Sequence, residues 1–223
     1  MPSASSVPIC AFIFDLDGTL IDSKLDIVNS VNAMLRKTGR SELPVETIAG
    51  FVGHGAPQLI ASVLGAEASE NDKKSALSIF LEHYEHHNLE ETRAYPGVKE
   101  GLAALAGYPK VVLTNKPTKA SMQILKGLGL MEFFVAVYGG DSFESKKPDP
   151  AGALHILKEL SVPAEQAAMV GDSEVDIQTA RNASMQAIAV TYGFGNYNRV
   201  SDPADSYIGS LVDLCALSLS NRA

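Results

Sequence analysis

Short apolar runs alternate with helical patterns along most of the chain. Apolar runs bounded by turn residues predict buried strands at residues 11–14, 110–115, 135–140, 167–172 and 187–193, with a shorter one at 206–208. Segments with helical spacing lie between them, at 96–106, 117–128, 150–160 and 175–183, and a last helix is expected to run through Leu217. Apolar strands that alternate with helices indicate a parallel sheet covered on both faces.

The stretch between residues 23 and 91 has no convincing strand pattern. Its apolar residues predict one helix over residues 25–37, two short helices around a glycine-rich turn at 53–55, and a longer helix over 72–87. A helical block of this length after a single strand is best explained as an insertion.

The predicted fold class is therefore α/β, a doubly wound parallel sheet (a Rossmann-like core) with an inserted all-helical cap domain. Residues 1–21 and 92–223 are expected to form the core, and residues 22–91 the cap that follows the first strand.

Composition narrows the classes of function. The chain has 223 residues and a net charge of −8, which argues against broad binding of nucleic acid or of anionic membranes. Cys10 and Cys215 are too few for a disulfide framework, so we expect both thiols to be reduced and packed in the core. We expect a cytoplasmic protein that is a monomer or a homodimer. The first apolar run is too short for a membrane span.

Two carboxylates end the first predicted strand. Residues two apart on a strand point the same way, so Asp15 and Asp17 approach one small volume, and Gly18 lets the chain turn away. Like charges at the end of a buried strand are costly unless a cation or a shared proton compensates them. The alternative is a surface turn with two solvated acids.

Further polar residues follow the other predicted strands. Ligand crevices in such sheets lie outside the carboxyl ends of the strands. The residues concerned are Thr114 and Asn115, Lys147, and Asp172 with Asp176. Each has a plain alternative: Thr114 and Asn115 could cap a helix, Lys147 could be solvated with Lys146, and Ser173 with Asp176 fits a capping box. The cluster His83, His86 and His87 is interpreted as a solvated helix face rather than a metal site.

Together these residue types suit phosphoryl transfer. A carboxylate such as Asp15 can attack phosphorus and form an aspartyl-phosphate. An anion that attacks an anion needs positive charge, which Mg²⁺ on Asp15 and Asp172, together with Lys147, would supply. Thr114 can donate its hydroxyl to a phosphoryl oxygen, and Asp17 remains for acid–base work.

Four motifs carry a family resemblance. FDLDGTL, LTNKP, SKKPDP and VGDSEVDI occur in the order found in haloacid dehalogenase-like phosphatases, which this chain resembles. LIDS, AYPGV and VTYGFG resemble the phosphoglycolate phosphatase group within that superfamily.

The resemblance implies a role for each matching residue. Asp15 would be the nucleophile, Asp17 the acid and base, and Lys147 the residue that steadies nucleophile and phosphate. Mg²⁺ would bind the Asp15 and Asp172 side chains and the Asp17 main-chain carbonyl. Thr114 and Asn115, with Gly18 and His54, would bind phosphate or substrate. Asp176, beside Ser173, would orient metal-bound water, and the cap would close over a small phosphorylated metabolite.

Substrate identity is the open point. Residues 41–72 contain no Lys or Arg, although a carboxylate such as that of phosphoglycolate favours a cation. His54, the amides near Gly53 and Gly55, or a core residue remain as candidates. The alternative functions are a phosphomutase of the β-phosphoglucomutase type, a pyrophosphatase, and a phospho-acceptor signalling or binding domain.

Overall fold

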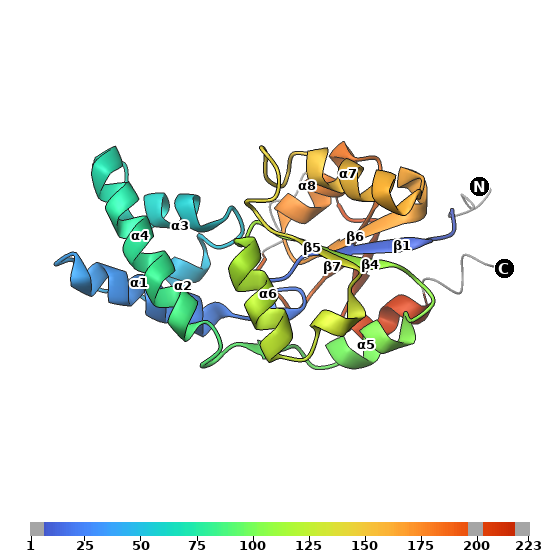
Figure 1. Ribbon diagram of the computed structural model, residues 1–223, viewed down its shortest axis with the longest axis horizontal. Helices are drawn as coiled ribbons and strands as arrows, with labels where there is room; N and C mark the ends of the chain where they lie inside the picture. Colours follow the sequence, from blue (N-terminus) through green and yellow to red (C-terminus); the bar gives the residue numbers. More distant parts are fainter. Residues whose placement is uncertain (1–6, 196–202, 217–223) are drawn as a thin grey trace.

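A six-stranded parallel sheet forms the centre of the molecule. The computed structural model describes residues 7–195 and 203–216, and the sheet has the order β5-β4-β1-β6-β7-β8 (Figure 1). The strands are β1 (Ala11–Phe14), β4 (Lys110–Leu113), β5 (Ala136–Tyr138), β6 (Ala167–Gly171), β7 (Gln186–Val190) and β8 (Ser206–Ile208). All neighbouring strands are parallel, as the alternation of elements predicted.

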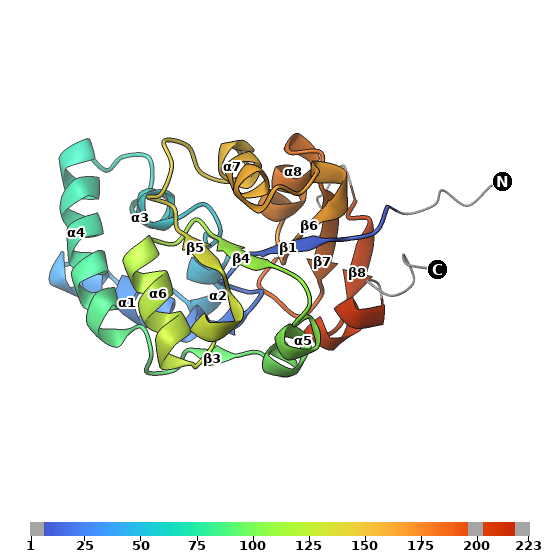
Figure 2. The ribbon, with the colours of Figure 1, turned by 45° about the vertical axis from the view of Figure 1, so that its right-hand side comes forward.

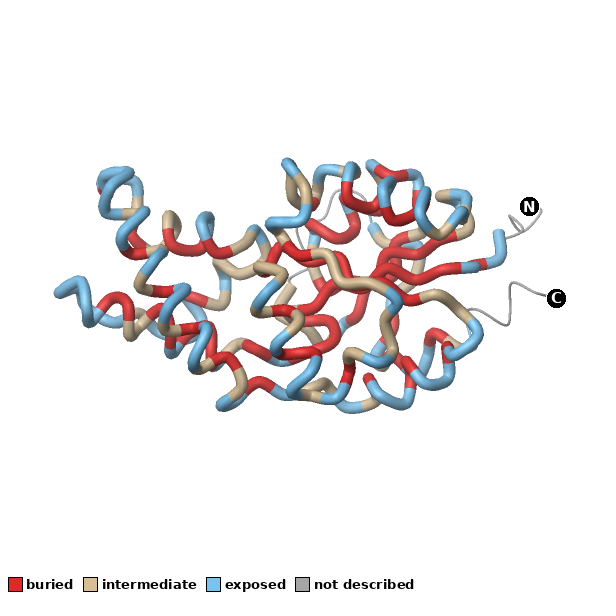
Figure 3. The backbone as a smooth tube through the Cα atoms, viewed as in Figure 1, coloured by how far each residue is buried: buried red, intermediate tan, exposed pale blue. Residues whose placement is uncertain are grey.

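Helices cover both faces of this sheet (Figures 1 and 2). Phe12 and Phe14 pack on the face of α5 (Val98–Ala104) and α6 (Thr118–Gly127), whereas Ala11 and Ile13 pack on the opposite face. That second face is covered by α7 (Ala151–Leu160) and α8 (Glu174–Asn182). Every residue of the central strands β1, β4 and β6 is buried, which explains why these strands are mostly apolar without alternation; Figure 3 shows the buried centre of the sheet.

The remaining helices form a separate group beyond the carboxyl ends of the strands (Figure 1). They are α1 (Lys24–Lys37), α2 (Val45–Ala49), α3 (Ala56–Leu64) and α4 (Glu70–His87). The chain enters the group through β2 (Ile21–Asp22) and leaves it through β3 (Arg93–Ala94), and these two strands pair antiparallel. The sequence pattern did not predict this ribbon, because two residues are too few to show a period.

A buried carboxylate fixes this crossing. Asp26, in the first turn of α1, accepts hydrogen bonds from the Glu91 amide at 2.9 Å and from the Thr92 amide and hydroxyl at 2.9 and 2.7 Å. Asp26 is 1% exposed. The entry and exit segments of the helical group are therefore tied to each other.

Element ends differ modestly from expectation. The strand expected over residues 110–115 ends at Leu113, so Thr114 and Asn115 lie beyond the sheet. Near the C-terminus a 3₁₀ turn at Leu211–Asp213 leads into helical residues 214–216, and Leu217, where the final helix was expected to end, lies outside the described residues. Two further 3₁₀ turns occupy Met131–Phe133 and Ala164–Gln166. Cys10 is exposed, so the expectation of a core thiol was wrong there.

In residues 7–195 and 203–216, no helix combines the length and the apolar character that crossing a bilayer needs.

Candidate active site

The strand order reverses at β1, which has β4 on one side and β6 on the other. Such a switch point is where open α/β sheets bind ligands. Asp15, Thr114 and Asp172 directly follow these three strands and line a cavity of about 530 Å³ between the sheet and the helical group. The structure therefore brings together the residues that the sequence placed at separate strand ends.

A buried lysine joins two of the acids. The Lys147 ammonium lies 2.8 Å from Asp15 Oδ1 and 2.6 Å from Asp176 Oδ1. Burial alone lowers the pKa of Lys147, but the carboxylates of Asp15 and Asp176 outweigh it and raise that pKa above its ordinary value. The interpretation of Lys147 as a solvated loop residue is excluded, since it is only 6% exposed.

Asp172 is held by backbone amides and by close packing. Its Oδ2 accepts hydrogen bonds from the amides of Phe194 at 2.7 Å and Gly195 at 3.1 Å, and Thr19 Oγ1 lies 3.4 Å from Oδ1. Gly18 has a φ of +82°, and a Cβ at this position would lie 2.1 Å from Asp172 Oδ2. Glycine is thus required here both for its backbone conformation and for the approach of Asp172.

Three buried carboxylates are suited to hold a cation. Asp15, Asp172 and Asp176 each offer an oxygen, and these oxygens lie within 4.8 Å of one another. Burial, against the opposing effect of Lys147, raises the pKa of Asp15 to about 6. Burial and the neighbouring Asp176 and Asp15 raise the pKa of Asp172 to about 8. Carboxyl groups with raised pKa values are stabilised in their ionised form by a bound cation, and a hard divalent cation prefers such oxygen ligands.

Asp17 points to a different partner. Both of its carboxylate oxygens lie 2.9 Å from the Lys116 ammonium, and Ser23 donates a short hydrogen bond to Oδ1. The Asp17 side chain is thus outside the three-carboxylate group, which leaves its main-chain carbonyl as the atom expected to bind metal.

Asn115 connects the loops around the cavity. Its Nδ2 donates to the carbonyls of Gly53 at 2.9 Å and Lys147 at 3.0 Å, while its buried Oδ1 has no hydrogen-bond partner within the described part of the chain. Thr114 Oγ1 accepts from the Lys116 amide at 3.3 Å. Neither residue caps α6, whose first amide, that of Thr118, donates to Asp141 instead.

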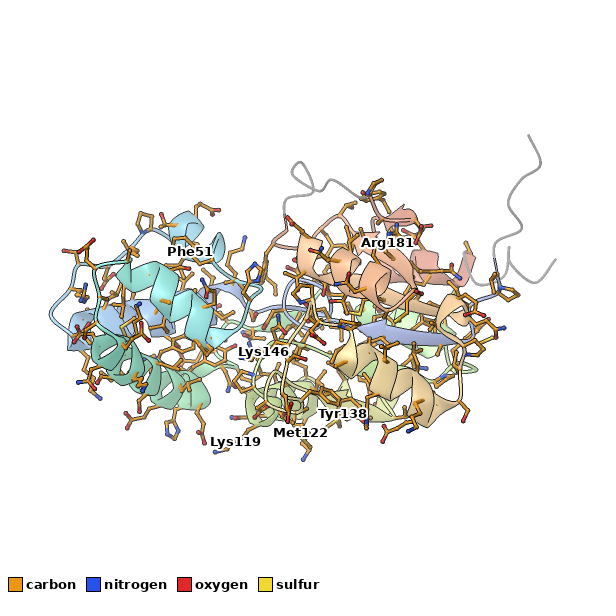
Figure 4. The ribbon with its side chains drawn as sticks, turned by 90° about the horizontal axis from the view of Figure 1, so that it is seen from above. Phe51, Lys119, Met122, Tyr138, Lys146 and Arg181 are labelled. Carbon is orange, nitrogen blue, oxygen red and sulfur yellow. The ribbon has the colours of Figure 1, made fainter. Side chains whose placement is uncertain are left out.

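The other candidate residues lie at several places in the fold. Ser173 and Asp176 form the predicted capping box of α8, with the Ser173 amide 3.1 Å from Asp176 Oδ2. His54 lines the cavity from the glycine-rich turn and is exposed. Lys146 lies where the helical group meets the sheet (Figure 4). The histidines 83, 86 and 87 lie elsewhere, on α4, where His83 bonds Ser30 at 3.0 Å and no third metal ligand is gathered among the described residues.

Sequence reasoning missed three features of this site. Lys116 was not singled out, although it directly follows Thr114 and Asn115 in the LTNKP motif and so sits at a strand end. The amides of Phe194 and Gly195 were missed, and the signal for them is the glycine spacing of YGFG, since a Cβ at Gly195 would lie 1.6 Å from the Asp172 carbonyl oxygen. Tyr84 gave no separate signal, because its helical spacing also fits plain core packing.

Comparison with known proteins agrees with this geometry. The model of the family described as haloacid dehalogenase-like hydrolase matches residues 12–190. A phosphoglycolate phosphatase of Cupriavidus necator is 39% identical, with 95% of this chain and 94% of that protein covered. One from Psychrobacter arcticus is also 39% identical, over 90% of this chain and 93% of the relative.

A solved structure shows the same fold. A protein from Haemophilus somnus, described as a predicted phosphoglycolate phosphatase, has a TM-score of 0.87 at 30% identity. The similarity covers 94% of this chain and 98% of that one. With the family model spanning both the sheet and the helical group, and with relatives matched over nearly their full length, the chain belongs to the haloacid dehalogenase-like hydrolases.

Proposed function

We propose that the protein is a Mg²⁺-dependent phosphatase that hydrolyses a small phosphorylated carboxylic acid, and that phosphoglycolate is its preferred substrate. The observation that carries this proposal is the meeting of Asp15, Lys147 and Asp172 at the sheet edge of one cavity, three groups from distant parts of the sequence. The names of the relatives in Cupriavidus and Psychrobacter support the choice of phosphoglycolate.

The chemistry runs in two steps. One carboxylate oxygen of Asp15 attacks phosphorus, the bond to the ester oxygen breaks, and Asp17 gives its proton to the departing alcohol. Asp17 then takes a proton from water, which attacks the phosphorus of the aspartyl-phosphate and releases inorganic phosphate and free Asp15. Thr114 and Asn115 hold the phosphoryl oxygens, and Lys147 keeps the attacking carboxylate in position.

The metal would be held by the side chains of Asp15 and Asp172 and by the Asp17 main-chain carbonyl. Asp176, which is bonded to Ser173, would orient metal-bound water. When bound, Mg²⁺ supplies the positive charge that lets an anionic carboxylate approach an anionic phosphate.

The helical group would act as the cap. In this proposal residues 22–91 form the cap domain, and residues 1–21 and 92–223 form the core. With the Gly53 carbonyl bonded to Asn115, as it is here, the cap would keep the turn that carries His54 over the substrate and limit the access of water to the aspartyl-phosphate.

A panel of phosphate esters tests the proposed substrate. With Mg²⁺ present, phosphate release from phosphoglycolate is expected to have the highest kcat/KM in a set that includes glucose 6-phosphate, β-glucose 1-phosphate, ethyl phosphate and pyrophosphate. Equal or better turnover of a sugar phosphate or of pyrophosphate contradicts phosphoglycolate as the substrate. Transfer of phosphate to a sugar phosphate, without release, would favour the phosphomutase instead.

Mg²⁺ is expected to stabilise the protein more at pH 8 than at pH 5.5. The pKa values of Asp15 and Asp172, about 6 and about 8, lie above the ordinary 3.8, so the folded chain binds more protons than the unfolded chain between about pH 4 and pH 8. Without metal, stability contributed by these groups falls as pH rises through that window. Mg²⁺ binds the ionised carboxylates, so the stability that Mg²⁺ adds increases as the pH rises.

Thermal unfolding measures this linkage. At a Mg²⁺ concentration about 100-fold above Kd, the gain in Tm at pH 8 should be roughly 5–10 °C. Na⁺ at matched ionic strength is the control. Equal gains at the two pH values, or none at either, would contradict the metal assignment.

A further inference from the structure

Lys116 is a buried cation on the wall of the cavity, and its position is unusual. It is 6% exposed, and burial alone lowers its pKa, but the Asp17 carboxylate outweighs this effect and raises the pKa above the ordinary value. It therefore stays charged. Its ammonium is shared between Asp17, at 2.9 Å, and the face of the Tyr84 ring, 4.5 Å from the centroid.

Tyr84 brings a second polar group to the same place. It comes from α4 of the helical group, lines the cavity and is 4% exposed. The Lys116 ammonium lies beside this side chain, but no hydrogen bond of good geometry reaches the Tyr84 hydroxyl within residues 7–195 and 203–216. A buried hydroxyl without a partner costs free energy, and a ligand that accepts its hydrogen bond would recover that cost.

The chemistry of the substrate fixes where its carboxylate must lie. In phosphoglycolate only one carbon separates the ester oxygen from the carboxylate. The cation that binds the carboxylate must therefore lie next to the acid that protonates the ester oxygen. Asp17 is that acid in the proposed mechanism, and Lys116 touches it. Lys119 also lines the cavity, but its side chain is 75% exposed and is paired with Glu85.

We propose that Lys116 and Tyr84 form the subsite for the carboxylate of the substrate, and that binding moves the Lys116 ammonium from Asp17 to that carboxylate. This inference rests on the proposed function. An ester with a neutral tail leaves Lys116 paired with Asp17 and gains no ion pair at this subsite, so the subsite selects esters that carry a carboxylate. A core residue would thereby supply the cation that residues 41–72 lack.

Matched substrates and variants test the subsite. For Lys116→Met, kcat/KM for phosphoglycolate is expected to fall roughly 20-fold more than kcat/KM for ethyl phosphate, because both esters lose the partner of Asp17 but only phosphoglycolate loses the ion pair with its carboxylate. For Tyr84→Phe, which keeps the ring over the ammonium, KM for phosphoglycolate should rise about 3- to 10-fold with ethyl phosphate unaffected. Lys119→Met is the control and should behave as wild type with both esters.

Binding gives a readout that does not depend on turnover. Calorimetry would compare 3-phosphonopropionate, a non-hydrolysable analogue of phosphoglycolate, with propylphosphonate, which has the same chain without the carboxylate. Lys116→Met should weaken the first about 100-fold and the second less than about 3-fold. Tyr84→Phe repeats the comparison at a position where the change is too small to threaten folding.

The outcomes separate the two proposals. If wild type prefers phosphoglycolate and both variants keep that preference, the subsite is wrong and the proposed function stands. If Lys116→Met loses activity equally on both esters, Lys116 only positions Asp17, and the subsite is again overturned. If wild type hydrolyses ethyl phosphate as well as phosphoglycolate, the proposed substrate fails, and the subsite fails with it.

Discussion

Asp15→Asn is expected to lower kcat by about 10⁴-fold or more while leaving the fold intact, because the substitution removes the nucleophile and little else. Asparagine has nearly the same shape, and Lys147 keeps Asp176 as its partner at 2.6 Å. Burial already disfavours the charge on Asp15, so the metal-free variant should unfold at the same temperature as wild type or slightly higher. Phosphate release and thermal unfolding are the two measurements.

Asp26→Asn is the matched control for this variant. It changes another buried aspartate, which does not line the cavity and which accepts hydrogen bonds from the Glu91 and Thr92 amides. It should lower the stability by about 1–3 kcal/mol and preserve the turnover of the folded enzyme. Turnover of Asp15→Asn within tenfold of wild type would remove Asp15 as the nucleophile.

Lys147→Met is expected to damage both activity and stability, and the loss of stability should depend on pH. Removing one partner of a buried ion pair typically costs about 3–5 kcal/mol, here about 10 °C in Tm at pH 8. With the lysine gone, the pKa of Asp15 rises further above about 6, because Lys147 is the main influence that holds it down. Asp15 is then protonated and uncharged at pH 5, so much of the stability should return there.

Lys146→Met provides the comparison, since it removes the adjacent, half-buried lysine of the same loop. Its effect on Tm should be within about 2 °C. Equal losses of Tm for Lys147→Met at pH 5 and pH 8 would show that Lys147 acts by packing rather than by charge.

The parts of the fold that could be predicted are those with a strong local pattern. The run ending at Phe14 is apolar because both faces of β1 are covered, and its sudden change to Asp15 marks the carboxyl end of the strand. Since parallel strands end at one edge, Asp15, Thr114 and Asp172 could be brought together without coordinates.

Other features depend on contacts that no local pattern records. The pairing of Lys116 with Asp17 joins residues 99 positions apart, and the chain gives no sign of which acid each lysine selects. The orientation of the Tyr84 ring over Lys116 depends on how α4 sits on the core. Solvated and buried lysines look alike in sequence, so Lys146 and Lys147 could be distinguished only by their surroundings.

The two-residue ribbon of β2 and β3 has an evolutionary implication. Asp22 pairs with Arg93, so the helical group is inserted in the core as a long hairpin loop whose two ends lie side by side. Lengthening, shortening or exchanging that loop changes the closure entropy only slowly with its length and leaves the register of the central strands untouched. New specificities could therefore arise by grafting other segments between these two positions, with the phosphate chemistry below them inherited unchanged.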